Sequence, residues 1–371
     1  MRTEPKLKFL FAGGGTGGHL FPALAVAEAV QLLYPNAECV FLGRGDKLEA
    51  RMVPLSGFKF FPILAEGFNR LNKMRVPIIL IKFTVGLIQS IVFCMRFRPH
   101  TALGTGGYIS SAPIVAARLT SANTVLLESN SYPGISTKLL EYGADKIFTV
   151  YRETRSLLRN TDRIQLTGNP IRLNIKRYDR DAALHKFGFS SDLKTLVIIG
   201  GSGGAMALNE FVKTNVLNFA KNGIQVILQT GPAYFDEYIK LASSNIKVVS
   251  FFETIEDAYS AGDLFICRAG AATISELQYL GLPAILVPSP YVAENHQYYN
   301  AKALVDANAA KLVFQNEIGE RLFIETVQLI QDEQKKCELA AAIKKMSVQD
   351  AAAVIAKQLI ELALSSRKSK E

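Results

Sequence analysis

Cysteine is scarce in this sequence, and its spacing matches neither a metal site nor a disulfide framework. Cys39, Cys94, Cys267 and Cys337 are scattered over 371 residues without a C-x-x-C pair. A zinc site or a disulfide scaffold is therefore not expected, and a reducing cytosol fits the sequence better. The first residues also lack the charged head, apolar stretch and small-residue cleavage site of a signal peptide, so none is predicted.

Long basic runs and Arg/aromatic RNA-binding motifs are absent as well, although the net charge is +9. We therefore expect no nucleic-acid partner. The positive charge fits a phosphorylated substrate or the anionic inner face of a membrane. A solvated basic surface without a partner is the plainer alternative.

One apolar segment, Val76 to Phe97, approaches the length of a membrane span, which takes about 20 residues. Lys82 and Gln89 interrupt it, and Pro77 suits the first turn of a helix. Basic residues flank the segment: Lys73, Arg75, Arg96 and Arg98. We interpret it as a helix with one face in a core and an unusually apolar opposite face. A true membrane span is the less favoured interpretation. A fully buried helix and a helix in the membrane interface are equal alternatives at this point.

Apolar runs alternate with helical stretches along the chain, which predicts parallel sheets built from βαβ units. Strands are expected within residues 7–13, 38–43, 101–107, 123–129 and 146–151, and again within 195–201, 224–231, 246–252, 264–270 and 283–289. Each half opens with a strand, a glycine cluster and a helix. The predicted fold class is α/β, with two Rossmann-like doubly wound domains and an active site in the cleft between them.

The boundary between the two domains is expected near Leu166–Arg172, where Gly168 and Pro170 break regular structure. This divides the chain into residues 1–167 and 168–349. A closing helix over about 350–364 alternates alanine with larger apolar residues, and it could pack on either half.

Three glycine turns follow predicted strands, at residues 13–18, 104–107 and 200–204. Glycine lets the backbone adopt positive φ and approach a ligand closely, and the following helix directs its free N–H groups at an anion. One such turn is weak evidence, because tight strand–helix turns need glycine anyway. Three of them indicate several phosphates, or a pyrophosphate on each side.

The first turn contains G-x-G-x-x-G, which raises the alternative of an NADP-dependent dehydrogenase. Such enzymes need an acid at the end of the second strand for the ribose hydroxyls. This chain has Gly43 and Arg44 there, with Asp46 beyond the strand, although Arg44 could hold a 2′-phosphate. A P-loop is excluded more firmly, since no G-K-[ST] follows any of the turns.

His19 is the one histidine of four that lies in a glycine turn. The positive end of a helix dipole disfavours imidazolium, so the ring is expected to be neutral and able to accept a proton. A neutral imidazole beside bound phosphates and hydroxyls is suited to general base catalysis. A histidine that only caps the turn is the structural alternative.

Two later stretches are rich in polar groups. Residues 268–277 (RAGAATISEL) enter a helix with Glu276 one turn in, where a carboxylate suits ribose hydroxyls or a buried helix start. Residues 288–301 carry Gln297 and Asn300, whose amides read sugar hydroxyls without adding charge. Arg172 lies at the boundary and could neutralise a pyrophosphate leaving group.

Seven motifs together resemble the MurG family, bacterial transferases that add N-acetylglucosamine to lipid I. They are GGGTGGHLFPALA, GTGGYISSAP, ESNSYPGISTK, LTGNPIR, GGSGGA, RAGAATISEL and HQYYNA, in that order. The resemblance runs from Phe9 to about Leu364 and is specific when the motifs are taken jointly. It implies the GT-B fold. Another GT-B enzyme or epimerase acting on UDP-N-acetylglucosamine remains a rival, without a use for the basic apolar helix.

The resemblance also implies the binding sites. The UDP-N-acetylglucosamine site would comprise Thr16, Gly17, Gly18, Asn130, Arg172, Ser202, Phe252, Ala271, Ala272, Thr273, Ile274, Ser275, Glu276, Gln297 and Asn300. The acceptor pyrophosphate would meet Gly14, Gly15, Gly106, Gly107 and Tyr108. Phe252 would reach the uracil through its backbone, and Glu276 would bind the ribose.

The implied reaction is an inverting transfer to the 4-hydroxyl of the muramoyl sugar in lipid I, which forms lipid II. His19 is the preferred base, and Glu128 is the competitor, as base or as partner of His19. No cofactor or metal is expected, because Arg172 and the helix start at Ser202 can hold the diphosphate. The family usually has histidine where this chain has Leu127, which gives His19 more weight.

The family docks on the cytoplasmic face of the cell membrane through its first domain, so the resemblance favours the interfacial interpretation of Val76–Phe97. The expected partners are therefore UDP-N-acetylglucosamine, lipid I and the anionic inner-membrane surface. Proteins of cell-wall synthesis are compatible further partners.

Overall fold

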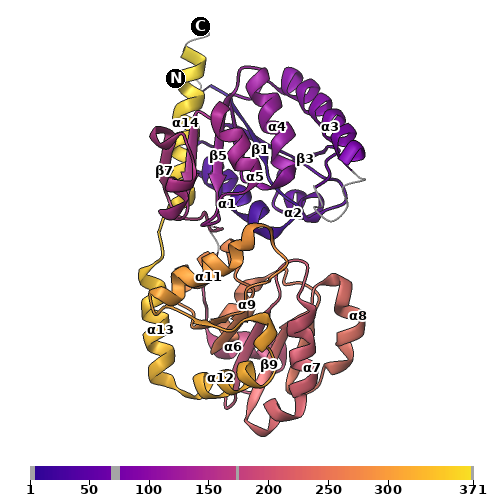
Figure 1. Ribbon diagram of the computed structural model, residues 1–371, viewed down its shortest axis with the longest axis vertical. Helices are drawn as coiled ribbons and strands as arrows, with labels where there is room; N and C mark the ends of the chain where they lie inside the picture. The colour runs from indigo at the N-terminus through magenta and orange to yellow at the C-terminus, as the bar shows by residue number, and fades with distance from the viewer. Residues whose placement is uncertain (1–4, 68–75, 173–174, 369–371) are drawn as a thin grey trace. The chain divides into compact units, whose positions relative to one another are not determined.

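The computed structural model describes residues 5–67, 76–172 and 175–368 of the chain (Figure 1). The flanking Lys73 and Arg75 of the apolar segment lie outside these residues. The chain forms two compact units. The first is built from Met1–Leu173 and Val348–Glu371, and the second from Asn174–Ser347.

The first unit contains a parallel sheet of seven strands in the order β3-β2-β1-β4-β5-β6-β7. The strands are β1 (Leu7–Ala12), β2 (Ala37–Gly43), β3 (Lys59–Pro62), β4 (Thr101–Gly104), β5 (Asn123–Glu128), β6 (Lys146–Thr149) and β7 (Ile164–Leu166). Side chains alternate between the two faces of a strand. Phe9 and Phe11 therefore enter one apolar core, whereas Leu10 enters another.

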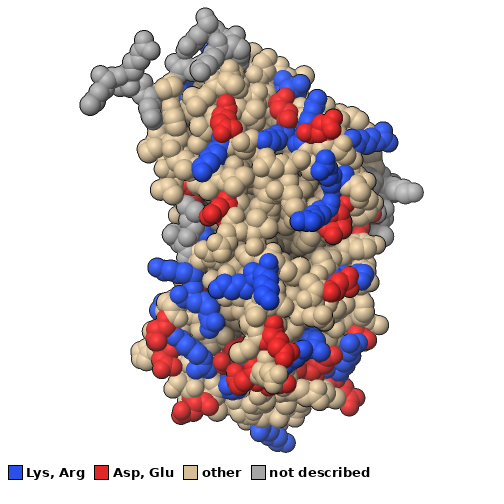
Figure 2. Space-filling view, turned by 90° about the vertical axis from the view of Figure 1, so that its left-hand side faces the viewer, with Lys and Arg blue, Asp and Glu red and all other residues tan. Residues whose placement is uncertain are grey.

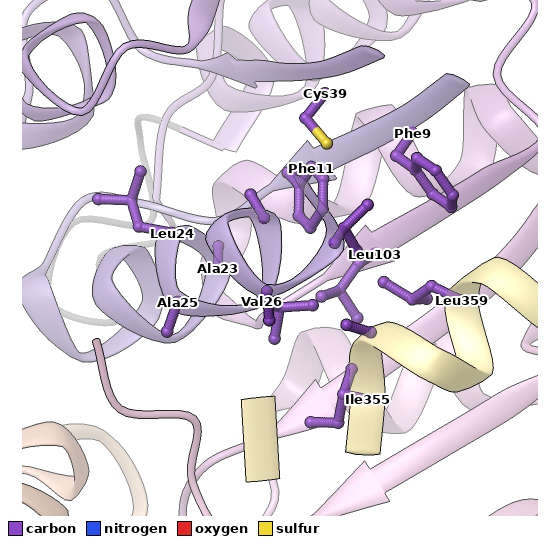
Figure 3. Close-up of a cluster of buried hydrophobic side chains, with 14 of the residues drawn as sticks. Phe9, Phe11, Ala23, Leu24, Ala25, Val26, Cys39, Leu103, Ile355 and Leu359 are labelled. Carbon is purple, nitrogen blue, oxygen red and sulfur yellow. The ribbon is translucent and has the colours of Figure 1, made fainter. Parts of the chain in front are cut away.

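Helices cover both faces of this sheet. They are α1 (Gly17–Leu33), α2 (Leu48–Leu55), α3 (Val76–Phe97), α4 (Gly107–Leu119), α5 (Ile135–Leu140) and α14 (Ala351–Lys368). The core on the α1 side is closed by the last helix, because Ile355 and Leu359 of α14 are buried among Val26, Phe9 and Leu103 (Figure 3). The closing helix thus packs on the first unit, and it extends past its predicted end at residue 364.

The second unit repeats the plan with six parallel strands in the order β10-β9-β8-β11-β12-β13. The strands are β8 (Lys194–Ile199), β9 (Ile224–Gln229), β10 (Ile246–Val249), β11 (Leu264–Cys267), β12 (Ala284–Leu286) and β13 (Lys311–Leu312). The main helices are α6 (Arg180–Phe187), α7 (Met206–Lys221), α8 (Phe235–Tyr238), α9 (Ile255–Ala261), α10 (Ala271–Leu280), α11 (His296–Asp306), α12 (Glu320–Gln331) and α13 (Glu333–Lys345). The prediction of two doubly wound α/β domains is confirmed.

Helix α3 has the bounds that its apolar pattern predicted, but it is far from fully buried. Its buried residues are the small Gly86, Ser90 and Cys94, and a Cβ on Gly86 would meet the carbonyl oxygen of Leu64. The opposite face exposes large apolar side chains: Ile78, Leu80, Ile81, Val85, Ile88, Val92 and Met95. The fully buried alternative is wrong. Within the described residues α3 alone is long and apolar enough to cross a membrane, a test that core helices of soluble proteins also pass.

The net positive charge is not gathered into one patch on the face drawn in Figure 2. There, Lys and Arg side chains are interspersed with Asp and Glu. At the surface of the second unit, Lys302 pairs with Asp306 and Lys335 with Glu338.

Candidate functional site

Three loops of the first unit meet at the carboxyl edge of its sheet. Ala12 of β1 is in register with Leu42 of β2 and with Gly104 of β4. The turns that follow these strands therefore leave the sheet side by side. They carry Gly13–His19, Gly43–Asp46 and Thr105–Tyr108.

His19 lies in the first turn of α1, with its ring against the second glycine turn. A Cβ on Gly106 would approach Nδ1 of His19 to 2.9 Å, and one on Gly107 would approach its Cδ2 to 3.1 Å. Both glycines also have positive φ, +94° and +74°. Glycine is therefore required here by backbone conformation and by the imidazole together.

The hydrogen bond of the His19 ring assigns its tautomer. Nδ1 lies 2.9 Å from the carbonyl oxygen of Thr105, and the Thr105 hydroxyl donates to the carbonyl oxygen of His19 at 2.6 Å. Because a carbonyl oxygen only accepts, Nδ1 must carry the proton. In the neutral ring Nε2 is then an acceptor, which is the form a general base needs. The sequence had no signal for the pairing with Thr105, which lies 86 residues away.

Glu49, in the first turn of α2, is a part of the site that the sequence did not predict. Its side chain is 1% exposed. Oε2 accepts from the Gly15 amide at 2.9 Å and Oε1 accepts from the Arg44 amide at 3.0 Å. A Cβ on Gly14 or Gly43 would lie within 2.7 Å of this side chain. The carboxylate thus explains part of the glycine pattern, and it already occupies an amide that we expected to face a bound pyrophosphate.

The side chain of Arg44 reaches the residue that follows the second glycine turn. Its NH1 donates to the Tyr108 hydroxyl at 3.2 Å. Its Nε and NH2 donate to the two carboxylate oxygens of Asp46 at 2.9 and 2.6 Å. This guanidinium lowers the pKa of the Asp46 carboxyl, so Asp46 remains ionised near neutral pH.

Glu128, at the end of β5, is 2% exposed and accepts four hydrogen bonds. Oε1 accepts from the backbone and side-chain amides of Asn130, at 3.0 and 3.1 Å. Oε2 accepts from the Gly134 amide at 3.0 Å and from the Thr137 hydroxyl at 2.6 Å. The carboxylate therefore shapes the loop that carries Asn130 and the start of α5. The neighbouring Leu127 is fully buried in the core beneath α1 and α14.

The other predicted residues of the first unit lie around the same edge. Thr16 is exposed at the N-cap of α1 and its side chain makes no capping bond, while Gly17 and Gly18 begin the helix. The Arg172 guanidinium lies 5.0 Å from the centre of the Phe21 ring of α1. The Ser129 hydroxyl donates to Asn169 at 3.0 Å, which joins the loop after β5 to the segment before Arg172.

The second unit brings its predicted residues to the carboxyl edge of its own sheet. Ile199 is in register with Cys267, and Cys267 with Leu286. The glycine turn with the half-buried Ser202 therefore lies near the starts of α10 and of the segment leading to α11. Gln229 supports this turn by donating from Nε2 to the Gly201 carbonyl at 3.0 Å.

Glu276 lies on α10 and is buried, and the hydroxyl of Tyr259 on α9 donates to its Oε2 at 2.5 Å. Tyr259 was not predicted, because only the fold brings α9 beside α10. Ala271, Ile274 and Ser275 are buried, while Ala272 and Thr273 are half-buried. Phe252 is likewise buried in the core of this unit.

Arg268 holds together the loops that carry the predicted sugar-binding amides. Its guanidinium donates to the carbonyl oxygens of Val287 and Pro288 and to Oε1 of Gln315, at 3.1, 3.4 and 2.6 Å. Burial lowers the pKa of Arg268 to about 10. Gln297 accepts from the Ser289 amide at 2.8 Å, and the buried Asn300 donates to the Ala269 carbonyl at 3.3 Å. The sequence missed this role of Arg268 as a cross-link.

Among the residues that the structure describes, no three His, Cys, Asp or Glu side chains are grouped to hold a metal ion. The chemistry assembled here is of another kind. The first unit combines an oriented imidazole, glycine amides and an arginine, and the second combines a glycine turn, a buried carboxylate and side-chain amides. Such groups can bind phosphates and hydroxyls and move a proton.

Known proteins resemble the chain over nearly its whole length. The Glycosyltransferase family 28 N-terminal domain matches residues 9–149 and the C-terminal domain matches residues 195–359. A Christiangramia forsetii protein is 35% identical over 96% of this chain and 98% of its own length. A Bacteroides thetaiotaomicron protein is 37% identical over 97% and 99%. Both are named UDP-N-acetylglucosamine--N-acetylmuramyl-(pentapeptide) pyrophosphoryl-undecaprenol N-acetylglucosamine transferase.

A solved structure supports the same fold. The crystal structure of MurG from Acinetobacter baumannii superimposes with a TM-score of 0.70, covering 96% of this chain and 99% of that one at 24% identity. At this identity the likeness concerns the fold alone. The predicted GT-B fold is confirmed.

Proposed function

Because the chain belongs to the family of UDP-N-acetylglucosamine--N-acetylmuramyl-(pentapeptide) pyrophosphoryl-undecaprenol N-acetylglucosamine transferases, we propose that it transfers N-acetylglucosamine to lipid I. The donor is UDP-N-acetylglucosamine, the acceptor is the 4-hydroxyl of the muramoyl sugar, and the product is lipid II. The observation that carries this proposal is the His19 ring, held by Thr105 with Nε2 as the acceptor nitrogen beside two glycine turns.

His19 acts as the general base. As the acceptor oxygen attacks the anomeric carbon, its proton passes to Nε2, and the bond from that carbon to the UDP oxygen breaks. Attack from the face opposite UDP inverts the configuration and gives a β1→4 link. The Thr105 carbonyl stabilises the imidazolium that forms, because it keeps accepting from Nδ1.

Glu128 is a positioning residue in this proposal. Its four hydrogen bonds use both carboxylate oxygens, and each of those bonds would weaken if the group took up a proton. Its contribution is to place Asn130, which we assign to the donor sugar. Leu127 stands where the family usually has histidine, and it lies in the apolar core. The proposed reaction therefore uses no base at position 127.

The donor is held mainly by the second unit. Glu276 binds the ribose hydroxyls through its carboxylate, which Tyr259 fixes in place. The turn at Ser202 and Arg172 bind the diphosphate, and the backbone of residues 271–275 and of Phe252 lines the nucleotide. Gln297 and Asn300 face the sugar, while Thr16, Gly17 and Gly18 approach it from the acceptor side.

The first unit binds lipid I and contacts the membrane. The pyrophosphate of lipid I lies at Gly14, Gly15, Gly106, Gly107 and Tyr108. Helix α3 rests in the interface of the cytoplasmic leaflet, with its exposed apolar face among the lipids and Arg96 and Arg98 at its end near anionic headgroups. The protein is then peripheral, and proteins of cell-wall synthesis are compatible partners there.

The test is an assay with radiolabelled UDP-N-acetylglucosamine and a soluble lipid I analogue. We expect acceptor-dependent formation of the disaccharide product. Consumption of UDP-N-acetylglucosamine without any acceptor, with conversion of the sugar, would identify the epimerase alternative instead. If neither the mixture with acceptor nor the mixture without it gives a product, the proposal is overturned.

A further inference from the structure

The proposed acceptor site contains an electrostatic conflict. The first glycine turn lies on the carboxylate of Glu49, which is 1% exposed and bonded to the Gly15 amide at 2.9 Å. A diphosphate bound at the same turn would bring like charges together where little water screens them, which is unfavourable. An anion site built on this turn therefore needs a nearby cation.

Arg44 is placed to supply that cation. The same carboxylate that occupies the turn also accepts from the Arg44 backbone amide at 3.0 Å, which fixes where the side chain starts. The guanidinium then reaches the Tyr108 hydroxyl at 3.2 Å, directly after the second glycine turn. It thus lies beside both turns assigned to the pyrophosphate, and its side chain is still 22% exposed.

The present partner of Arg44 is easily exchanged. Asp46 lies two residues away with a 62% exposed side chain and accepts two bonds from the guanidinium. Because the Asp46 carboxylate is exposed, water competes for both of these bonds and solvent screens the attraction between the two charges. A phosphate offers the guanidinium the same two-oxygen geometry with more negative charge. Bidentate hydrogen bonds between arginine and phosphate are stronger than hydrogen bonds between neutral groups.

We propose that Arg44 binds the diphosphate of the lipid-linked acceptor. The Tyr108 hydroxyl orients the guanidinium, which exchanges its ion pair with Asp46 for the diphosphate. This inference rests on the proposed function, since it needs an acceptor diphosphate at the two glycine turns. Arg44 offsets the charge of Glu49 and so makes the first turn usable by an anion.

The test compares three variants in the purified full-length protein. Arg44→Gln should raise the acceptor KM on the order of tenfold or more, as for a lost charged hydrogen bond, and leave the donor KM unchanged. Lys47→Gln removes the same charge from the same loop at an exposed position and is the matched control. Asp46→Asn releases Arg44 and should lower the acceptor KM.

Inorganic pyrophosphate is the second probe, used as an inhibitor competing with the acceptor at saturating donor. Its Ki should rise in Arg44→Gln, fall in Asp46→Asn and stay unchanged in Lys47→Gln. A purely structural Arg44–Asp46 pair predicts that both variants of the pair weaken the protein alike. Equal acceptor KM and Ki in Arg44→Gln and Lys47→Gln, or parallel losses in Arg44→Gln and Asp46→Asn, would overturn the inference.

Failure of the Arg44 proposal can be distinguished from failure of the proposed function. If the wild-type protein transfers sugar but Arg44→Gln behaves like the control, only the role of Arg44 fails. If the wild type shows no transfer, calorimetric titration of pyrophosphate in the presence of UDP still compares the variants. If Arg44→Gln does not fold, Arg44→Lys, which keeps the charge but loses the bidentate geometry, and Asp46→Asn must still shift Ki in opposite directions.

Discussion

The two units open with nearly the same glycine-rich turn, but the glycines serve different purposes. In the first unit a Cβ at Gly13 would meet the Thr105 hydroxyl and one at Gly14 the Glu49 carboxylate. In the second unit a Cβ at Gly200 would meet the backbone of residues 204–205, and one at Gly204 the Thr230 carbonyl. Glycine is needed in the first turn because polar side chains lie close to it, and in the second turn because main-chain atoms do. The same glycine pattern therefore has a different physical cause in each unit.

The comparison depends most on His19. We predict that His19→Ala lowers kcat on the order of 10²–10⁴-fold, the usual contribution of a positioned general base. UDP affinity, measured by calorimetry, should be nearly unchanged because the donor is assigned mainly to the second unit. Glu128→Gln, assayed beside it, should lower kcat less and reduce the free energy of unfolding, because it disturbs an organised loop. A larger kcat loss in Glu128→Gln would transfer the base role to Glu128.

The second unit's turn can be tested with two alanine substitutions. Gly201 and Gly204 have positive φ, +86° and +76°, but only Gly204 faces nearby backbone, because a Cβ there would overlap the Thr230 carbonyl oxygen. Gly201→Ala should cost about 1–2 kcal/mol from strain, and Gly204→Ala about 3–5 kcal/mol once crowding is added. Urea unfolding measures both. Equal costs would show that crowding by main chain does not explain Gly204.

Glu276→Ala tests binding in the second unit. It should raise the donor KM on the order of tenfold, since a charged hydrogen-bond acceptor to the ribose is lost, while kcat falls little. Tyr259→Phe is the milder companion, because it removes the 2.5 Å bond to Glu276 and leaves the carboxylate in place. Unchanged UDP affinity in Glu276→Ala would reject the ribose assignment.

Membrane binding should belong to the first unit alone. Ile81 on α3 is 63% exposed and Leu217 on α7 of the second unit is 74% exposed, so they form a matched pair. Ile81→Ser should weaken co-sedimentation with anionic liposomes, and Leu217→Ser should not. Binding should also weaken with salt, because each cation near anionic lipid contributes about 1 kcal/mol. Binding released only by detergent would indicate insertion or a dominant apolar anchor.

The smallest effect is expected at the opposite end of β2 from the site. Lys59 and Lys6 lower the pKa of the Glu38 carboxyl to about 2. This group therefore stabilises the fold above its ordinary pKa of 4.5 and loses that contribution as the pH falls toward 2. The difference in Tm between wild type and Glu38→Gln should be largest near neutral pH and vanish only below pH 2, with kcat unchanged. A constant difference would contradict the ion-pair origin.

The sequence predicted the interior of the fold better than its margins. The ten expected strands form, because buried parallel strands are continuous apolar runs. The missed strands β3, β7 and β13 lie at sheet edges. They are short, and β3 carries a lysine and a proline, as edge strands often do.

The candidate site was predictable where its residues follow a strand and not where they meet across the fold. His19, Glu128 and Glu276 stand in local motifs that indicate a strand end or a helix start. Glu49, Thr105 and Tyr259 reach the site only through tertiary packing, over 34, 86 and 17 residues of chain. A single sequence carries no local pattern for such pairs.

Helix α14 sets the order in which the molecule can be completed during synthesis. Residues 174–347 of the second unit are contiguous, so this unit has all its parts while the chain is still emerging. The first unit begins earlier, yet its core lacks Ile355 and Leu359, and Thr101 and Asn123 lack the carbonyls of Leu359 and Leu362 that accept from them. The unit that is translated first is therefore completed last. Until α14 has been synthesised, the apolar side chains of α1 that α14 covers remain exposed to water.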